Sequence, residues 1–193
     1  MRRSLTLATA LLMGLSTLPI SAQGGWTVLL DGTTLKGWNI VGDANWQAVD
    51  GAVQATMGGT SFLVSANAYG DFQLTAEVFV SAGANSGIFV RCQDPKTITA
   101  TNAYEVNIYD TRPDPAYRTG SIVDVAKPMA TVNADGRWTT VDITMKGTRL
   151  VVVMNGTKTV DMDHKGHARG PIALQYGQSS TLVRFRNVRI RQL

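Results

Sequence analysis

Apolar and polar residues alternate with a period of two along most of this chain, and the clearest case is the run 104–110. One side of this run is apolar and the other carries a carboxylate, an amide and a phenol: Tyr104, Val106 and Ile108 against Glu105, Asn107 and Tyr109. Successive side chains on a β-strand point to opposite faces. The run therefore predicts a strand with one face in a core and the other in contact with a ligand.

The run 85–91 has the same character and is the expected partner of this strand. It reads Asn-Ser-Gly-Ile-Phe-Val-Arg, and its polar side carries Asn85, Phe89 and Arg91. A longer alternating run, 71–80, places Glu77 on its polar side. If these strands are neighbours, then Glu77, Arg91 and Glu105 can meet on one surface.

Short runs of this kind recur at regular spacing to the C-terminus, with turn signals between them. Asp50-Gly51 and Asn155-Gly156 predict tight hairpins, whereas patterns typical of helices are almost absent. Many half-buried strands with little helix indicate two antiparallel sheets packed face to face. Two long polar loops, 94–102 and 111–127, flank the run 104–110 as loops at the rim of a binding face would.

The N-terminus has the features of a secretory signal peptide. Met1-Arg2-Arg3 precedes an apolar stretch from Leu5 to Leu18, and small residues follow up to Ala22. We expect cleavage after Ala22, a single domain over 23–193, and export to a bacterial periplasm or the medium. A membrane anchor is the alternative, but the apolar stretch is shorter than the ~20 residues that a span needs.

Charge and cysteine content narrow the remaining classes. The 193-residue chain has a formal net charge of +4 and no block of like charge. Four arginines near the C-terminus alternate with apolar residues, which predicts a strand with one solvated face and no nucleic-acid-binding patch. Cys92 is the only cysteine, so an intrachain disulfide is excluded, and we expect it to pack as a small apolar residue.

The candidate chemistry lies on the polar sides of the three runs. An arginine beside two carboxylates favours ionisation of both, so Glu77, Arg91 and Glu105 form either a catalytic group or a structural row of salt bridges. Phe89 and Tyr109 favour a sugar ligand, because a sugar ring has apolar faces and hydroxyl edges. A second cluster, Asp161 to His167, fits no metal-ligand motif well, and we expect a solvated loop there.

Nine segments, in order, resemble the 3-keto-disaccharide hydrolase family, which was first catalogued as domain of unknown function 1080 and is also described as 3-keto-glycoside lyases and hydratases. The most specific segments are Asn85–Arg91 and Gly170–Gln175. Asn107 stands where the family has glutamine in its Tyr-Glu-Val-Gln-Ile segment. The other segments span the mature chain: 28–38, 46–51, 69–74, 136–138, 150–156 and 185–190.

The resemblance implies a concanavalin-like or LamG-like jelly roll that acts on 3-keto-glycosides. A base removes the C2 proton, an oxyanion is stabilised, and the C1 leaving group departs. We expect Glu105, or else Glu77, to be the base and Arg91 to stabilise the oxyanion. The expected substrate-binding residues are Asn85, Phe89, Asn107, Tyr109 and Gln175.

Several alternatives stay open at this point. No cofactor is predicted, although a divalent cation could replace Arg91 as the stabilising group. A non-catalytic carbohydrate-binding module is the alternative function, because the fold alone cannot separate the two. The expected partner is a small carbohydrate, with no nucleic acid and no membrane after cleavage, and the oligomeric state is not specified by the sequence.

Overall fold

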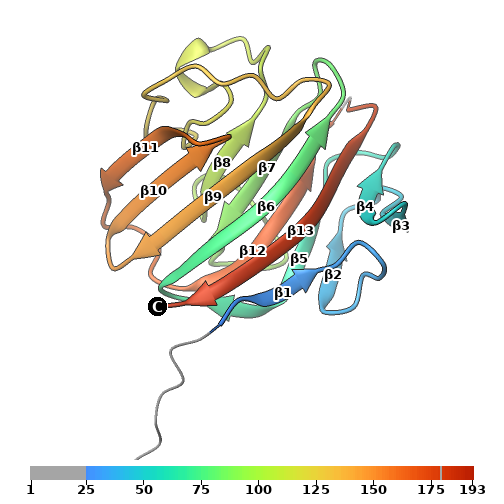
Figure 1. Cartoon of the computed structure of the whole chain (residues 1–193), viewed down its shortest axis with the longest axis horizontal. Helices are drawn as coiled ribbons and strands as arrows, with labels where there is room; N and C mark the ends of the chain where they lie inside the picture. The colour runs from blue at the N-terminus through green and yellow to red at the C-terminus, as the bar shows by residue number, and fades with distance from the viewer. Residues whose placement is uncertain (1–24, 179) are drawn as a thin grey trace, which may run out of the picture.

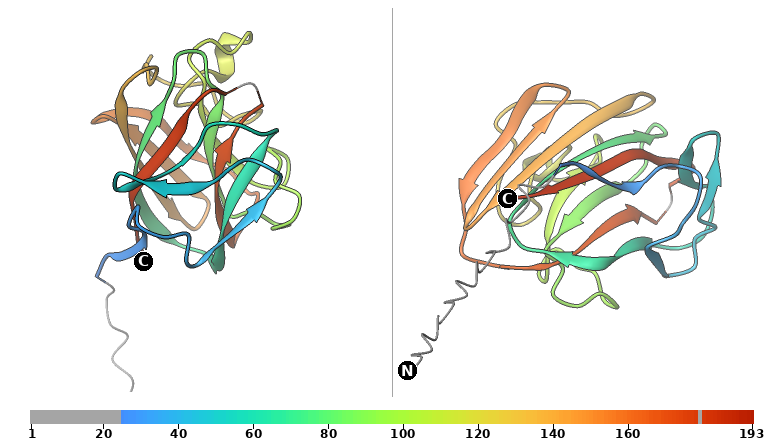
Figure 2. Two further views of the ribbon diagram at one scale, coloured as in Figure 1. Left: turned by 90° about the vertical axis from the view of Figure 1, so that its right-hand side faces the viewer. Right: turned by 60° about the horizontal axis from the view of Figure 1, so that its bottom comes forward.

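The computed structural model describes residues 25–178 and 180–193, and these form two antiparallel sheets that lie one over the other (Figure 1, Figure 2). The predicted signal peptide lies outside the described residues. Within the described part, no helix is long and apolar enough to cross a membrane. The all-β sandwich predicted from the alternation is confirmed.

Sheet A has eight strands, and β1 (Thr27–Leu30) joins it by pairing with β13. The other seven lie in the order β11 (Thr157–Asp163), β10 (Arg149–Met154), β9 (Trp138–Lys146), β6 (Phe72–Val80), β13 (Val183–Gln192), β4 (Ala52–Ala55) and β3 (Gln47–Val49).

Sheet B has five strands. Their order is β2 (Trp38–Val41), β5 (Ser61–Tyr69), β12 (Gly170–Tyr176), β7 (Ser86–Val90) and β8 (Tyr104–Ile108). A short 3-10 helix, η1 (Pro115–Tyr117), lies in the long loop that follows β8 (Figure 1).

The core lies between the sheets and is built from the apolar side of each alternating strand. In β6 every second residue from Phe72 to Val80 is buried, and the residues between them are half-buried. In β8 the core side chains are Tyr104, Val106 and Ile108, as the alternation predicts. Burying this apolar surface is the main stabilising contribution to the fold.

The predicted hairpin turns are also present. Asn155 and Gly156 join β10 to β11 with φ angles of 47° and 79°, and Asp50 and Gly51 join β3 to β4 with φ angles of 49° and 70°. Two successive positive φ angles match the right-handed twist of the flanking strands, and asparagine, aspartate and glycine tolerate them best.

Candidate functional site on the outer face of sheet B

β7 and β8 are neighbours in sheet B, as the sequence predicts, and their register sets the residues of the outer face in rows. Gly87 lies opposite Asn107, and Phe89 lies opposite Glu105. On the other side of β7, strand β12 places Ala173 opposite Phe89. The same register places Gln175 beside Gly87, so Gln175, Gly87 and Asn107 form one row and Ala173, Phe89 and Glu105 form the next.

A segment after η1 extends these rows beyond β8. The backbone N–H of Asn107 donates to the Ser121 carbonyl at 3.1 Å, and the N–H of Val123 donates to the Glu105 carbonyl at 3.1 Å. Ile122 forms an isolated antiparallel bridge with Val106 and is buried in the core. Ser121 therefore continues the Asn107 row, and Val123 continues the Glu105 row.

Four polar side-chain atoms of this face are buried and find no hydrogen-bond partner among the residues that the structure describes. They are Asn85 Oδ1, Asn107 Oδ1, Ser121 Oγ and Gln175 Oε1. We refer to these four as the orphan acceptors. Buried polar atoms in folded proteins are almost always hydrogen-bonded, either within the protein or to ordered water. This cluster on one face is therefore a place where a bound molecule or ordered water can supply the partners.

A side-chain contact orients the Asn107 amide, and a backbone contact positions Asn85. Asn107 Nδ2 donates to the Tyr117 carbonyl at 2.5 Å, which leaves Oδ1 as the free end of that amide. The Gly177 N–H donates to the Asn85 carbonyl at 2.9 Å, which holds Asn85 next to the end of β12. The amide oxygens of Asn85, Asn107 and Gln175 only accept, and the Ser121 hydroxyl can accept as well as donate, so the group suits a ligand rich in O–H donors.

Gly87 gives the central row its open space. A methyl group at this position would lie 3.3 Å from Cε2 of Phe89 and 3.4 Å from Oε1 of Gln175. It would also lie 3.3 Å from the Val106 carbonyl. The missing side chain therefore lets the Gln175 amide reach over β7 toward Asn107.

Glu105 is the ionisable group of this face, and only 7% of it is exposed. Burial raises the pKa of Glu105 to about 7, because an ionised carboxylate is poorly solvated there. The Arg112 guanidinium opposes this shift, and the Asp124 carboxylate adds to it. A carboxyl group with a pKa near neutrality is suited to proton transfer.

The side of the face next to Glu105 is apolar. Phe62 and Phe89 pack edge to face with ring centroids 5.3 Å apart. Residues of the 92–103 loop cover them and complete a second hydrophobic cluster: Cys92, Ile98 and Ala103. Phe89 lies opposite Glu105 in the register and is only 2% exposed, so it does not offer its ring to solvent. Cys92 packs as a small apolar residue, as expected, and burial raises the pKa of its thiol to about 12.

Five of the eight predicted site residues lie on one face: Asn85, Phe89, Glu105, Asn107 and Gln175. Tyr109 follows directly after the end of β8 and is half-buried. Sequence reasoning did not identify Ser121 or Arg112. The signal for Ser121 was the short return to a strand pattern after Gly120, which identifies a strand but not its neighbour.

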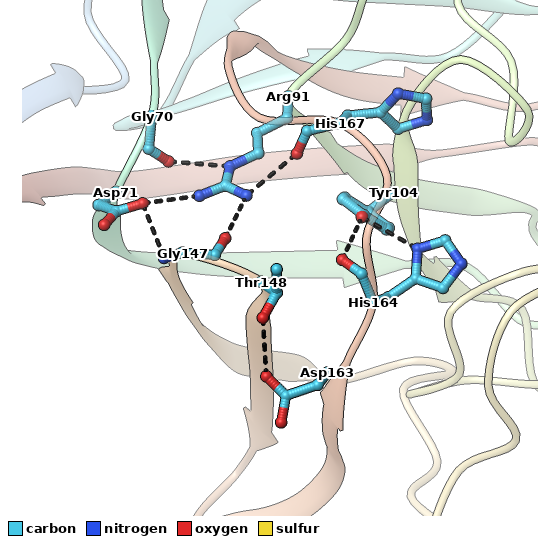
Figure 3. A network of polar contacts seen from close by, with 9 residues as sticks. All are labelled: Gly70, Asp71, Arg91, Tyr104, Gly147, Thr148, Asp163, His164 and His167. Carbon is cyan, nitrogen blue, oxygen red and sulfur yellow. Dashed lines mark hydrogen bonds and ion pairs between the residues drawn. The ribbon is translucent and has the colours of Figure 1, made fainter.

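Arg91 does not join this face, and the expectation that it does is wrong. β7 ends at Val90 and Arg91 has a φ angle of 55°, so the alternation stops one residue too early. Its guanidinium is buried at one end of the sandwich and donates to atoms from three separate loops (Figure 3). Its acceptors, at 2.9–3.0 Å, are the carbonyls of Gly70, Gly147 and His167 and Oδ1 of Asp71.

Glu77 is also absent from the Glu105 face. β6 belongs to sheet A, where it lies between β9 and β13, so Glu77 is on the opposite surface of the sandwich. It forms an ion pair with Arg186 at 2.6 Å and accepts a hydrogen bond from Asn187 Nδ2 at 2.7 Å. The expected meeting of Glu77, Arg91 and Glu105 on one surface is therefore wrong.

The Asp161–His167 segment is partly structural, where a solvated loop was expected. The Tyr104 hydroxyl lies 3.1 Å from His164 Nδ1, and Thr148 donates to Asp163 at 2.9 Å (Figure 3). Among the described residues, no group of three or more His, Cys, Asp or Glu side chains could hold a metal ion. The divalent-cation alternative stays untested.

A groove of about 430 Å³ lies elsewhere, where β1 and the loop after it meet β2 and β5. Its lining includes Asp31, Lys36, Trp38 and Asn67. It shares no residue with the Glu105 face and no orphan acceptor lines it, so it is a separate surface feature.

With this geometry in view, comparison with known proteins decides the family. The model of the 3-keto-alpha-glucoside-1,2-lyase-like domain matches residues 25–191. The chain belongs to this family. No curated protein matches the sequence.

Solved structures related to this lyase-like chain share its fold. A candidate glycosyl hydrolase from Parabacteroides distasonis ATCC 8503 is 24% identical with a TM-score of 0.74, and the match covers 88% of this chain and 100% of that one. A carbohydrate-binding module from Bacillus subtilis is 15% identical with a TM-score of 0.64, covering 81% and 96%. A galectin-like protein of unknown function from Bacillus subtilis is 10% identical with a TM-score of 0.63, covering 87% and 94%. The jelly-roll fold is therefore confirmed.

Proposed function

We propose that this protein is an enzyme that cleaves 3-keto-glycosides by elimination, with Glu105 as the base. The observation that carries the proposal is the position of one buried carboxyl group, with a pKa of about 7, beside the four orphan acceptors. The family match supports the same substrate class. A 3-keto group acidifies the C2 proton, so a carboxylate can serve as the base that removes it.

The reaction proceeds in balanced steps. The Glu105 carboxylate takes the C2 proton, and the electron pair of the C–H bond forms an enolate with C3. The enolate then collapses to a 1,2-unsaturated ketone as the C1–O bond breaks and the aglycone leaves with that electron pair. Water can add across the new double bond to give the free 3-keto sugar.

The remaining residues of the face hold the sugar. Asn85, Asn107, Ser121 and Gln175 accept hydrogen bonds from its hydroxyl groups, and Tyr109 lies at the rim. The Phe62 and Phe89 rings keep Glu105 away from bulk water, which holds its pKa near the pH of the reaction. We expect kcat/KM to rise with pH through about 7, because only ionised Glu105 can accept the proton.

The alternative is a non-catalytic carbohydrate-binding module, which the fold shared with such a module favours. The test uses the 3-keto derivative of a nitrophenyl glucoside beside the unoxidised glucoside. The enzyme releases nitrophenol from the 3-keto compound alone, and in D₂O it exchanges the C2 proton. If the protein binds either glycoside but neither releases nitrophenol nor exchanges deuterium, the binding-module alternative is correct.

We also propose that the protein is exported, which rests on the N-terminal pattern alone. In a Gram-negative host that expresses the full chain, the mature protein in the periplasmic fraction begins at Gln23. N-terminal sequencing or intact mass measures this directly. A protein that keeps Met1 and stays in the membrane fraction would support the anchor alternative.

A further inference from the structure

The proposed elimination needs a cation or a strong donor where the enolate oxygen forms. Arg91 was the expected group, but at least four of its N–H bonds go to structural acceptors at the end of the sandwich. A guanidinium with its donors engaged in this way cannot turn to a substrate without breaking the contacts between three loops. A different positive group has to serve the Glu105 face.

Arg112 lies in the loop between β8 and the segment that carries Ser121. Its guanidinium carbon lies 6.0 Å from the centroid of the Tyr117 ring. The carbonyl of Tyr117 in turn accepts the hydrogen bond from Asn107 Nδ2. These contacts link Arg112, through Tyr117, to the Asn107 row of the face.

The loop that carries Arg112 is held at both ends. Asp110 accepts from the Thr119 hydroxyl at 2.5 Å and from the backbone N–H groups of Ala134 and Asp135 at 2.8 and 2.9 Å. Inside the loop, Arg118 Nε donates to the Arg112 carbonyl at 2.9 Å. The backbone at Arg112 is therefore positioned before any ligand arrives, which lowers the entropy lost on binding.

The charge of Arg112 acts on Glu105 without an ion pair between them. Among the described residues, neither an ion pair nor a side-chain hydrogen bond engages the Arg112 guanidinium, whereas the guanidinium of Arg186 contacts Glu77 at 2.6 Å. The Arg112 charge lowers the pKa of Glu105, which agrees with the link through Tyr117 to the Asn107 row. The guanidinium donors are therefore available to a ligand that binds at this face.

We propose that Arg112 is the catalytic residue that stabilises the enolate oxygen while Glu105 removes the C2 proton. This role rests on the proposed elimination. As the proton moves to the carboxylate, the negative charge moves to the C3 oxygen, and the Arg112 guanidinium donates hydrogen bonds to it. When the enolate collapses, the negative charge leaves with the aglycone oxygen, and the Arg112 guanidinium no longer donates to an oxyanion.

The test compares Arg112→Gln, Arg112→Lys and the control Arg189→Gln on the 3-keto nitrophenyl glucoside. Arg189 is exposed on the outer face of sheet A, so its replacement makes the same charge change away from the site. We expect Arg112→Gln to lower kcat by about 10²- to 10³-fold, with little change in KM. Arg112→Lys recovers part of this loss, and Arg189→Gln keeps full activity.

Two further readouts separate a catalytic role from a structural one. Without the Arg112 charge, the acidic limb of the kcat/KM profile shifts to higher pH, and C2 deuterium exchange slows in parallel with turnover. Unchanged kcat in Arg112→Gln, or a rise in KM alone, overturns the role of Arg112. Loss of activity in Arg112→Gln with a melting temperature far below that of Arg112→Lys also overturns it, because the side chain is then structural.

The failure of this inference differs from the failure of the proposed function. If the wild-type protein is active and Glu105→Gln is inactive while Arg112→Gln is fully active, only the role of Arg112 is wrong. If the wild-type protein neither exchanges deuterium nor releases nitrophenol, the elimination itself is wrong and the role of Arg112 falls with it.

Discussion

The two outer faces of the sandwich are built from the same kind of alternating strand, but they differ in whether the glutamate on each face has an ion-pair partner. On sheet A, Glu77 is ion-paired with Arg186, and Arg186 also stacks over Trp138 at 3.9 Å from the ring centroid. On sheet B, Glu105 forms no ion pair among the described residues, and the nearby amide oxygen of Asn107 has no partner. The glutamate of one face is paired within the protein, whereas the glutamate of the other face is left without an ion pair beside unpartnered acceptors.

The two glutamates make the difference quantitative. Burial works against ionisation of Glu77, but hydrogen bonds from Asn187 and Arg186 outweigh it and lower its pKa. Burial dominates at Glu105 and raises its pKa to about 7. The sheet A face also has buried atoms without a partner, Nε of Arg184 and of Arg191, but both side chains bond through Nη2. Charged residues on the outer face of a strand therefore indicate a candidate site only where neighbouring residues do not supply their hydrogen-bond or ion-pair partners.

The largest expected effect comes from neutralising each glutamate in turn. Glu105→Gln lowers kcat/KM on a 3-keto-glycoside by about 10²- to 10⁴-fold, because the base is lost. Glu77→Gln leaves kcat/KM within about twofold, because Glu77 lies on the opposite surface and does not contact the site. Initial rates of nitrophenol release measure both.

Two outcomes would contradict the difference between the two glutamates. Equal activity of Glu105→Gln and the wild-type protein shows that another group is the base, and loss of activity in Glu77→Gln shows that sheet A takes part. Circular dichroism on both variants establishes that each is folded before the rates are compared.

The second effect is on stability, and the two glutamates should respond to pH in opposite ways. The pKa of Glu105 rises from 4.5 to about 7 on folding, so the folded state binds the proton more tightly. The stabilisation from Glu105 is full below about pH 4.5 and is lost as the pH rises through about 7. Glu105→Gln has no carboxyl group to ionise, so it does not lose this stabilisation. The difference in free energy of unfolding between Glu105→Gln and the wild type should therefore shift in favour of the variant by about 3 kcal/mol as the pH rises through this range.

Glu77 supplies the matched case of opposite sign. The pKa of Glu77 is lower in the folded protein than in the unfolded chain, so ionised Glu77 stabilises the fold above its unfolded pKa. This stabilisation is lost as the pH falls. Glu77→Gln should therefore lower the free energy of unfolding by under about 1 kcal/mol at neutral pH and by less in acid. Urea unfolding at pH 4.5, 6 and 8 measures both variants. If the stability of Glu105→Gln relative to the wild type does not increase with pH, then Glu105 is solvated in the folded protein.

The third effect compares two glutamines, one on each face. Gln175 Oε1 is an orphan acceptor, so Gln175→Met removes an unsatisfied buried group and should raise stability by about 1 kcal/mol. The same change removes a hydroxyl contact and raises KM about tenfold. Gln73 Oε1 accepts from Arg191, so Gln73→Met should lower stability by about 1 kcal/mol and leave KM unchanged. Thermal melts and KM values that match for the two variants would contradict the difference between the faces.

The smallest effect is expected at Gly87. The methyl group of Gly87→Ala meets Phe89 and Gln175 at 3.3 and 3.4 Å, so these side chains must shift by a few tenths of an ångström. We expect KM to rise about two- to fivefold and stability to change by less than about 1 kcal/mol. Initial rates of nitrophenol release over a range of substrate concentrations measure KM, and urea unfolding measures stability. An unchanged KM would show that the substrate does not approach the centre of the row.

The sequence predicted strand positions, core sides and which residues share the outer face of the candidate site, because these depend on local periodicity. Tyr104, Val106 and Ile108 are core residues as expected, and Glu105 and Asn107 share the outer face. Prediction from the sequence was wrong where the alternation ends, and it missed a residue whose position depends on pairing with another strand. Arg91 left the face because β7 ends at Val90, and Ser121 entered it through a strand pairing that no local pattern specifies.

Alternation by itself determined which side of each strand is polar, and with the turn signals it determined an all-β sandwich. Only the tertiary structure decided which polar sides lie together. β6 and β7 are consecutive, yet the chain between them crosses from sheet A to sheet B, and Glu77 and Glu105 lie on opposite surfaces as a result. The period of a strand specifies its two faces, but its neighbours follow from the packing of the whole core. Those neighbours decide that Glu77 is ion-paired and that Glu105 is a buried carboxyl group without an ion pair among the described residues.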